Sequence, residues 1–239
     1  MAEGWDEDAL RAVRGALHTQ DGAALLAALR RGPVREVLQL AGDGVAEAAA
    51  APRGLPGAAE MAAAFLDALQ ERGFRGDEEL AHRLRTVTGD AAIPLLRPIP
   101  VDVEMLAMLL EGDPAEYGGR LDLSTGECWP AFTDEREPGL EAEETDDSER
   151  WLCVPALGSR AGYRDMELFI DGLGDAALSD RLRMAIGGRG AFRRFKDVLA
   201  GDGRSWRWYQ RFCDERQRGR ARDWLAEEGY CPRLPVQRL

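Results

Sequence analysis

The sequence predicts an α+β protein that is mostly α-helical. Apolar residues recur at helical spacings of three and four through residues 1–90, and the same periodicity returns after residue 159. Between these parts, residues 119–155 show the alternating pattern of short strands. We therefore expect an N-terminal helical bundle or array, followed by a small antiparallel β-hairpin or three-stranded sheet packed with C-terminal helices.

Five helices are predicted within residues 1–90. Asp21 and Asp77 are suited to begin the second and the fifth helix, because a carboxylate stabilises the first helical turn. Gly73 is expected to end the fourth helix. The third is expected to break or bend near Gly42-Asp43-Gly44, because glycine weakens a helix interior.

Residues 91–100 divide the chain into two predicted domains. Three prolines lie in this segment, and proline disfavours helix interiors and central strands. We expect a helical domain at residues 1–90, a proline-rich linker at 91–100 and an α+β domain at 101–239.

The second domain is expected to begin with a short helix at residues 101–111. Two strands then flank the turn Ser124-Thr125-Gly126, in which Gly126 is expected to take a positive φ. Residues 151–155 are predicted as a third strand. Four amphipathic helices follow, with their apolar positions at 163–173, 178–186, 191–199 and 206–228.

Length and composition favour a cytoplasmic globular protein. The chain has 239 residues, of which 45% are hydrophobic, so it can bury a sizeable core. Its richest apolar run, Met105 to Leu110, is far shorter than the ~18 residues of a membrane span. The N-terminal residues MAEGWDED are acidic, unlike a secretory signal. We therefore expect no membrane partner.

Charge is distributed unevenly along the chain. Residues 181–239 hold fifteen basic and seven acidic residues, a net charge of +8, so the total of −12 leaves −20 for residues 1–180. Residues 134–149 hold nine acids and one arginine. This tract is either a solvated loop or a cover that competes with an anionic partner for the basic C-terminal surface.

The glycine-rich turn at residues 187–190 precedes a helix that carries several cations. Backbone N–H groups at such a turn bind anions, although the same pattern is typical of a tight helix–helix turn with solvated arginines. The candidate anion- or partner-binding residues are Gly188, Arg189, Gly190, Arg193, Arg194, Lys196 and Arg207. The nearby aromatic stretch 206–212 either stacks on unpaired bases or packs in the core, and its helical spacing favours the core.

Catalytic and metal-binding patterns are not found in the sequence. The four cysteines contain no CxxC pair, and the two histidines lie far from them, so no metal site and no cofactor are expected. No pattern places a nucleophile beside a base, so catalytic residues stay unassigned and an enzyme is the less favoured reading.

Four segments together resemble bacterial uncharacterised protein family 0158. They are Leu121–Glu127, Arg160–Ile170, Gly188–Leu199 and Ala221–Gly229, and the resemblance covers roughly residues 101–230. It supports the predicted domain boundary, and the family name carries no established activity.

The sequence therefore favours a non-catalytic intracellular interaction protein, an adaptor or regulator that binds another protein. One alternative is a nucleic-acid- or nucleotide-binding protein that uses the basic C-terminal surface for phosphate-bearing ligands. Another is an enzyme that acts on a small anionic substrate at the same glycine–arginine turn.

Overall fold

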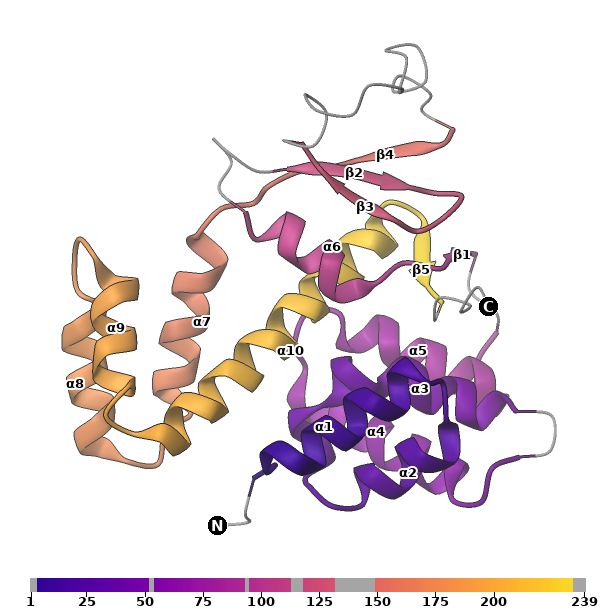
Figure 1. Ribbon diagram of the computed structural model, residues 1–239, viewed down its shortest axis with the longest axis horizontal. Coiled ribbons are helices and arrows are strands. Elements are labelled where there is room, and N and C mark those ends of the chain that lie inside the picture. The colour runs from indigo at the N-terminus through magenta and orange to yellow at the C-terminus, as the bar shows by residue number, and fades with distance from the viewer. Residues whose placement is uncertain (1–3, 52–53, 93–94, 113–117, 132–148, 234–239) are drawn as a thin grey trace.

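The fold is described here from a computed structural model that defines residues 4–51, 54–92, 95–112, 118–131 and 149–233. Nearly all of the acidic tract 134–149 lies outside these residues. The prediction that this tract covers the basic C-terminal surface therefore concerns residues that the structure does not describe. The described chain forms an α+β structure, mostly helical, with a three-stranded antiparallel sheet (Figure 1). This fold class is the one predicted.

The N-terminal helical unit is built from five α-helices and a short 3-10 helix. Asp21 accepts a hydrogen bond from the backbone N–H of Ala24 and so begins α2 as predicted. Gly73 ends α4 in the left-handed conformation. The elements are α1 (Glu7–His18), α2 (Gly22–Leu29), η1 (Val34–Glu36), α3 (Leu38–Ala50), α4 (Ala58–Arg72) and α5 (Asp77–Thr88).

The expected break near Gly42-Asp43-Gly44 is wrong, because α3 runs through these residues without interruption. The two glycines serve close packing instead. A Cβ atom at Gly42 would lie 2.5 Å from Leu80 Cδ2, and one at Gly44 would lie 2.6 Å from Leu25 Cδ2. Glycine lowers the intrinsic stability of the helix modestly, but it allows α2 and α5 to approach the backbone of α3.

The sheet contains the predicted hairpin and third strand. Its strands are β2 (Gly119–Asp122), β3 (Cys128–Pro130) and β4 (Trp151–Val154), in the order β3-β2-β4. Gly126 has a φ of +78°, as expected for the turn. A Cβ atom there would also overlap the backbone of Pro100, so the hairpin packs closely on the segment before α6 (Val103–Leu110).

A second, parallel pair of strands was not predicted. Strand β1 (Arg97–Ile99) lies in the segment expected as a linker, and it pairs with β5 (Tyr230–Pro232) near the end of the described chain. Each strand has only three residues, too few to show an alternating pattern. The pair joins the start of the second half of the chain to its end.

The C-terminal helical lobe is formed by α7 (Arg160–Asp171), α8 (Ala176–Ile186), α9 (Ala191–Leu199) and the first half of α10 (Gly203–Glu227). Aromatic rings fill its core. Phe169 lies 5.0 Å from Tyr209 and 4.7 Å from Trp208 between ring centroids, and Phe195 is fully buried beside them. The aromatic stretch 206–212 therefore packs in the core, the reading that its spacing favoured.

Helix α10 connects the whole molecule. It runs from the C-terminal helical lobe to the sheet and packs against α3, α5, α6 and α7 on the way (Figure 1). At Gly219 its backbone meets the turn before α5 so closely that a Cβ atom at Gly219 or at Gly76 would overlap the other backbone. Within the described ranges, no helix is both long enough and apolar enough to cross a membrane.

The packing role of Gly42 predicts a loss of stability on substitution. Gly42→Ala should lower the free energy of unfolding by about 1–3 kcal/mol, because the new methyl group overlaps Leu80. Urea denaturation measures this change. The matched control is Gly15→Ala in the exposed face of α1, where no atom lies within 4 Å of the new Cβ. It should raise stability by up to about 1 kcal/mol, and equal effects at the two positions would contradict the packing argument.

Candidate functional site

The interface between α10 and the elements around it contains many charged side chains. Five arginines of α10 are buried or half-buried there, and each forms an ion pair with a carboxylate from the first 180 residues. The pairs are Arg211–Glu36, Arg216–Asp165, Arg218–Glu104, Arg220–Glu111 and Arg222–Asp43. We call these the α10 ion-pair layer.

Arg222 joins α10 to α3 at the centre of this layer. Its Nη2 atom lies 2.7 Å from Asp43 Oδ2, its Nη1 atom lies 3.1 Å from Asp43 Oδ1, and its Nε–H donates to Gln39 Oε1 at 2.9 Å. Burial raises the pKa of Asp43, but the charges of Arg222 and Arg83 outweigh it and hold the pKa below its ordinary value. Asp43 therefore stays ionised at neutral pH.

Glu215 of α10 accepts hydrogen bonds from the N-terminus of α3, on the other side of the interface. It accepts hydrogen bonds from the backbone N–H groups of Gln39 at 2.7 Å and Leu40 at 2.9 Å. A helix start leaves such groups without partners, and a carboxylate stabilises them. Arg72 bridges Glu215, at 2.7 Å, to Asp77, at 2.6 Å, so α4 and α5 are fixed in the same network.

On the opposite side of α10, Asp165 of α7 accepts from two arginines. Its Oδ1 atom lies 2.7 Å from Arg216 Nε, and its Oδ2 atom lies 2.9 Å from Arg220 Nη1. Arg220 Nε also donates to Glu111 at 2.6 Å. This cluster fixes the C-terminal helical lobe to α10 and to the end of α6.

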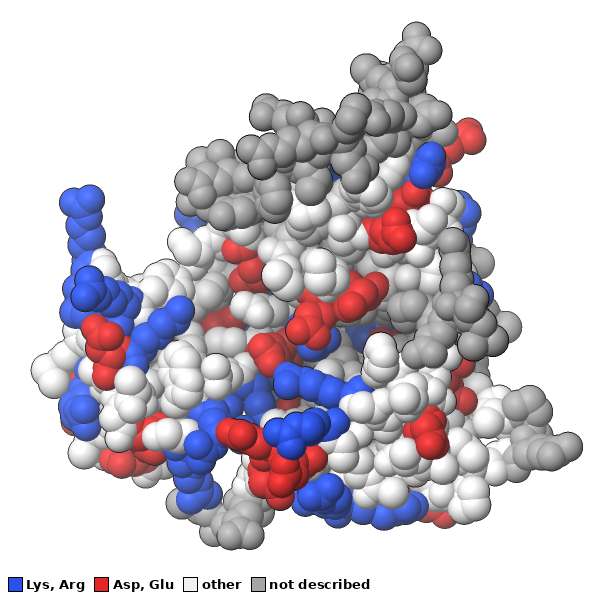
Figure 2. Space-filling view, in the orientation of Figure 1, with Lys and Arg blue, Asp and Glu red and all other residues white. Residues whose placement is uncertain are grey.

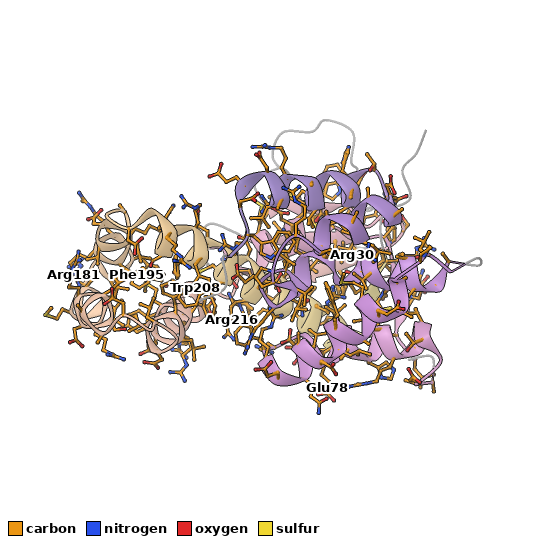
Figure 3. The ribbon with its side chains drawn as sticks, turned by 90° about the horizontal axis from the view of Figure 1, so that it is seen from below. Arg30, Glu78, Arg181, Phe195, Trp208 and Arg216 are labelled. Atoms are coloured by element: carbon orange, nitrogen blue, oxygen red, sulfur yellow. The ribbon has the colours of Figure 1, made fainter. Side chains whose placement is uncertain are left out.

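The seven candidate residues from the sequence lie at the end of the molecule formed by the C-terminal helical lobe, but the structure does not bring them all together. Gly188, Arg189 and Gly190 lie in the turn before α9, whereas Arg207 lies in the first turns of α10, beyond the opposite end of α9. Arg189, Arg193, Lys196 and Arg207 are exposed, and the only ion-pair partner near them in the described chain is Asp197, 4.0 Å from Arg193. Figure 2 shows basic side chains gathered at this end. In Figure 3, Arg181 points outward from the lobe while Phe195 and Trp208 lie inside it.

Arg194 differs from its neighbours because it stabilises the turn. Its guanidinium donates to the carbonyl oxygens of Ala185 at 3.0 Å and Gly187 at 2.6 Å, and also to that of Arg189. Gly188 and Gly190 have φ values of +80° and +79°, which glycine adopts readily. Arg194 therefore closes the α8–α9 turn, as in the tight-turn reading of this segment.

Exposed apolar side chains form a group on and beside α6. Met108 is 64% exposed, Met105 is 41% exposed, and Leu157, whose N–H donates to Leu110, is 47% exposed. The adjacent Glu104 is 60% exposed although it pairs with Arg218. Acidic side chains gather over α6 in Figure 2, so the apolar group has an acidic rim.

Two clefts adjoin on the face formed by α1, α3 and β5. One, of about 370 Å³, lies between α1, α2 and α3, and the other, of about 420 Å³, lies between α1, the start of α6 and the end of β5. Leu17, Gln20 and Arg233 line both clefts.

Two of the four thiols, those of Cys128 and Cys213, are poor candidates for a nucleophile. Burial raises the pKa of Cys213 to about 12, and burial with the charge of Asp102 raises that of Cys128 to about 12, so both are protonated at neutral pH. In the part of the chain that the structure describes, no group of three or more His, Cys, Asp or Glu side chains is arranged to hold a metal ion.

Sequence reasoning missed the partners of the α10 arginines. Gln39 and Asp43 were not singled out, although an acid between two helical glycines is a usable signal of a closely packed, charged contact. Arginine at every second position from 216 to 222 is a second signal, because it places cations on opposite sides of one helix.

Comparison with known proteins finds a family model that matches part of the chain. Residues 121–234 match the family model described as Uncharacterised protein family (UPF0158). This confirms the resemblance predicted from the four segments, although the match begins later than residue 101. Comparison with curated proteins found no match, and neither did comparison with solved structures.

The α10 ion-pair layer predicts that Arg222 contributes strongly to stability. Arg222→Met should lower the free energy of unfolding by about 3–5 kcal/mol, because it leaves the buried Asp43 without its bidentate partner. Urea denaturation is the measurement. Arg11→Met is the control, because Arg11 pairs with Asp8 on the surface, and it should cost less than about 1 kcal/mol. Similar small losses in both variants would contradict this role of the layer.

Proposed function

We propose that this protein is a non-catalytic, cytoplasmic interaction protein, an adaptor or regulator that binds another protein. The proposal rests chiefly on the apolar group at Met105, Met108 and Leu157, which is exposed at the surface beside the exposed Glu104. In this proposal residues 1–90 and 101–239 are two domains that act together, and the segment matching the family supplies part of the contact surface.

The arrangement of charge supports a protein partner. Most of the basic residues of α10 form ion pairs within the molecule, in the α10 ion-pair layer. Fewer cations are therefore available at the surface to bind nucleic acid. The face of α6 instead combines flexible methionine side chains with an acidic rim. Methionine suits adaptable helix-binding surfaces, and acidic rims favour basic partners. The partner proposed here is therefore a protein segment with apolar residues flanked by basic ones.

A photoreactive residue tests this surface directly. A benzoylphenylalanine at position 108 should crosslink to one protein in cells of the source organism, because Met108 is 64% exposed at the proposed contact. The control position is Gln70, which is exposed on α4. Met105→Glu should abolish the crosslink, and the purified partner should bind the wild-type chain but not this variant.

Two results would contradict the proposal. One is equal crosslinking from positions 70 and 108. The other is turnover of a small anionic substrate by the purified chain without any partner, which would favour the enzyme alternative at the glycine–arginine turn.

A second candidate function, binding of nucleic acid or a phosphate-bearing ligand, is favoured by the exposed cations Arg189, Arg193, Lys196 and Arg207. These side chains do not take part in the α10 ion-pair layer. Their number is small, so such binding would be weaker than the +8 charge of residues 181–239 suggests.

Salt dependence measures this second function. If it is correct, affinity for a short single-stranded oligonucleotide should fall steeply with salt, and the double variant Arg193→Glu/Lys196→Glu should lose it while remaining folded. Arg194→Ala is unsuitable as a test because it opens the α8–α9 turn. Arg35→Glu, on the N-terminal helical unit, is the control and should bind normally. Absent or salt-insensitive binding would remove this candidate.

A further inference from the structure

The cleft between α1, α2 and α3 has apolar walls. Its volume of about 370 Å³ falls within the range of small-molecule sites, roughly 300–1,000 Å³. The walls are formed chiefly by Ala16, Leu17, Leu25, Ala48, Ala51 and Leu55. An apolar molecule in this cleft would therefore lose contact with water and gain contact with aliphatic side chains.

Two glycines explain why the leucines line the cleft without filling it. A Cβ atom at Gly22 would lie 2.6 Å from Leu55 Cδ1, and one at Gly44 would lie 2.6 Å from Leu25 Cδ2 and 2.7 Å from Leu17 Cδ2. The three leucines are therefore seated directly against the backbone of α2 and α3. This packing keeps their side chains at the walls.

The mouth of the cleft carries two acids and one cation, and their partners differ. Asp21 accepts from the N–H of Ala24 at 2.9 Å, and Glu47 pairs with Arg83 at 2.7 Å. Arg233 forms no ion pair within the described ranges, and its backbone N–H donates to Ile99 at 2.8 Å, which fixes the residue beside the cleft. Of these three charged side chains, Arg233 is the one that can attract an anion, and within the described residues its guanidinium is not engaged in an ion pair.

We propose that this cleft binds a small amphiphilic acid, a molecule with an apolar body and a single anionic group. The apolar body occupies the leucine- and alanine-lined cleft, and the anionic group pairs with the guanidinium of Arg233. Such a site is separate from the exposed α6 face and from the cations of the C-terminal helical lobe, so it does not depend on the proposed protein partner.

A pair of fluorescent probes separates the two parts of this recognition. 8-Anilinonaphthalene-1-sulfonate carries an apolar body and an anion, and N-phenyl-1-naphthylamine has the same aromatic body without the sulfonate. The folded full chain should bind the sulfonate saturably at one site. Arg233→Glu should weaken that binding about tenfold or more, because it replaces a charge-assisted contact with repulsion, and should leave the affinity for the neutral probe unchanged.

Two further variants make the test specific. Arg181→Glu removes an exposed cation from α8, far from the cleft, and should bind both probes as the wild type does. Leu55→Gln should weaken both probes, because Leu55 lines the apolar wall. Circular dichroism confirms that each variant is folded.

Three results would overturn the proposal. The first is the absence of saturable binding of the sulfonate to the wild-type chain. The second is equal affinity of the wild type and Arg233→Glu for the sulfonate, and the third is an equal loss in Arg181→Glu. Failure of the α6 crosslinking experiment would leave this inference unaffected, because the two surfaces share no residue.

Discussion

The fold depends on the pairing of α10 arginines with carboxylates from η1, α3, α7 and both ends of α6. Removing a charged side chain from water is costly unless a partner is well placed, so a buried arginine tolerates few positions of its neighbours. Successive arginines at positions 216, 218, 220 and 222 are two residues apart, about 200° around the helix. Arg216 and Arg220 therefore reach Asp165 on one side, while Arg222 reaches Asp43 on the other. This spacing lets one helix fix the position of two separate groups of helices.

The same pairing explains the uneven charge of the chain. A basic C-terminal quarter usually indicates an anionic ligand. Here the acidic partner lies within the chain, because the carboxylates that meet α10 all come from residues 1–180. The net charge of a segment does not tell whether its charged side chains pair within the molecule or remain available to a ligand. Only the structure distinguishes these two cases.

Local patterns allowed much of the fold to be predicted. Gly126 was expected at a positive φ because a tight turn needs it, and the rings of residues 206–212 were expected in the core because their spacing matches one helical face. Contacts between distant residues were not predictable in this way. Gln39 and Glu215 are 176 positions apart, and neither has a local pattern that indicates the other. The glycines of α3 were misread for the same reason, since their packing partners lie on α2 and α5.

The segment that matches the family model lacks the partners of some of its own buried charges. Within residues 121–234, Arg218 pairs with Glu104 and Arg222 with Asp43, and strand β5 pairs with β1. All three partners precede residue 121. Cutting the chain at the edge of the match would expose buried arginines and an unpaired strand. The N-terminal helical unit therefore supplies Asp43, the partner of a buried charge in this segment, and the cleft of about 420 Å³ is lined by residues from both halves of the chain.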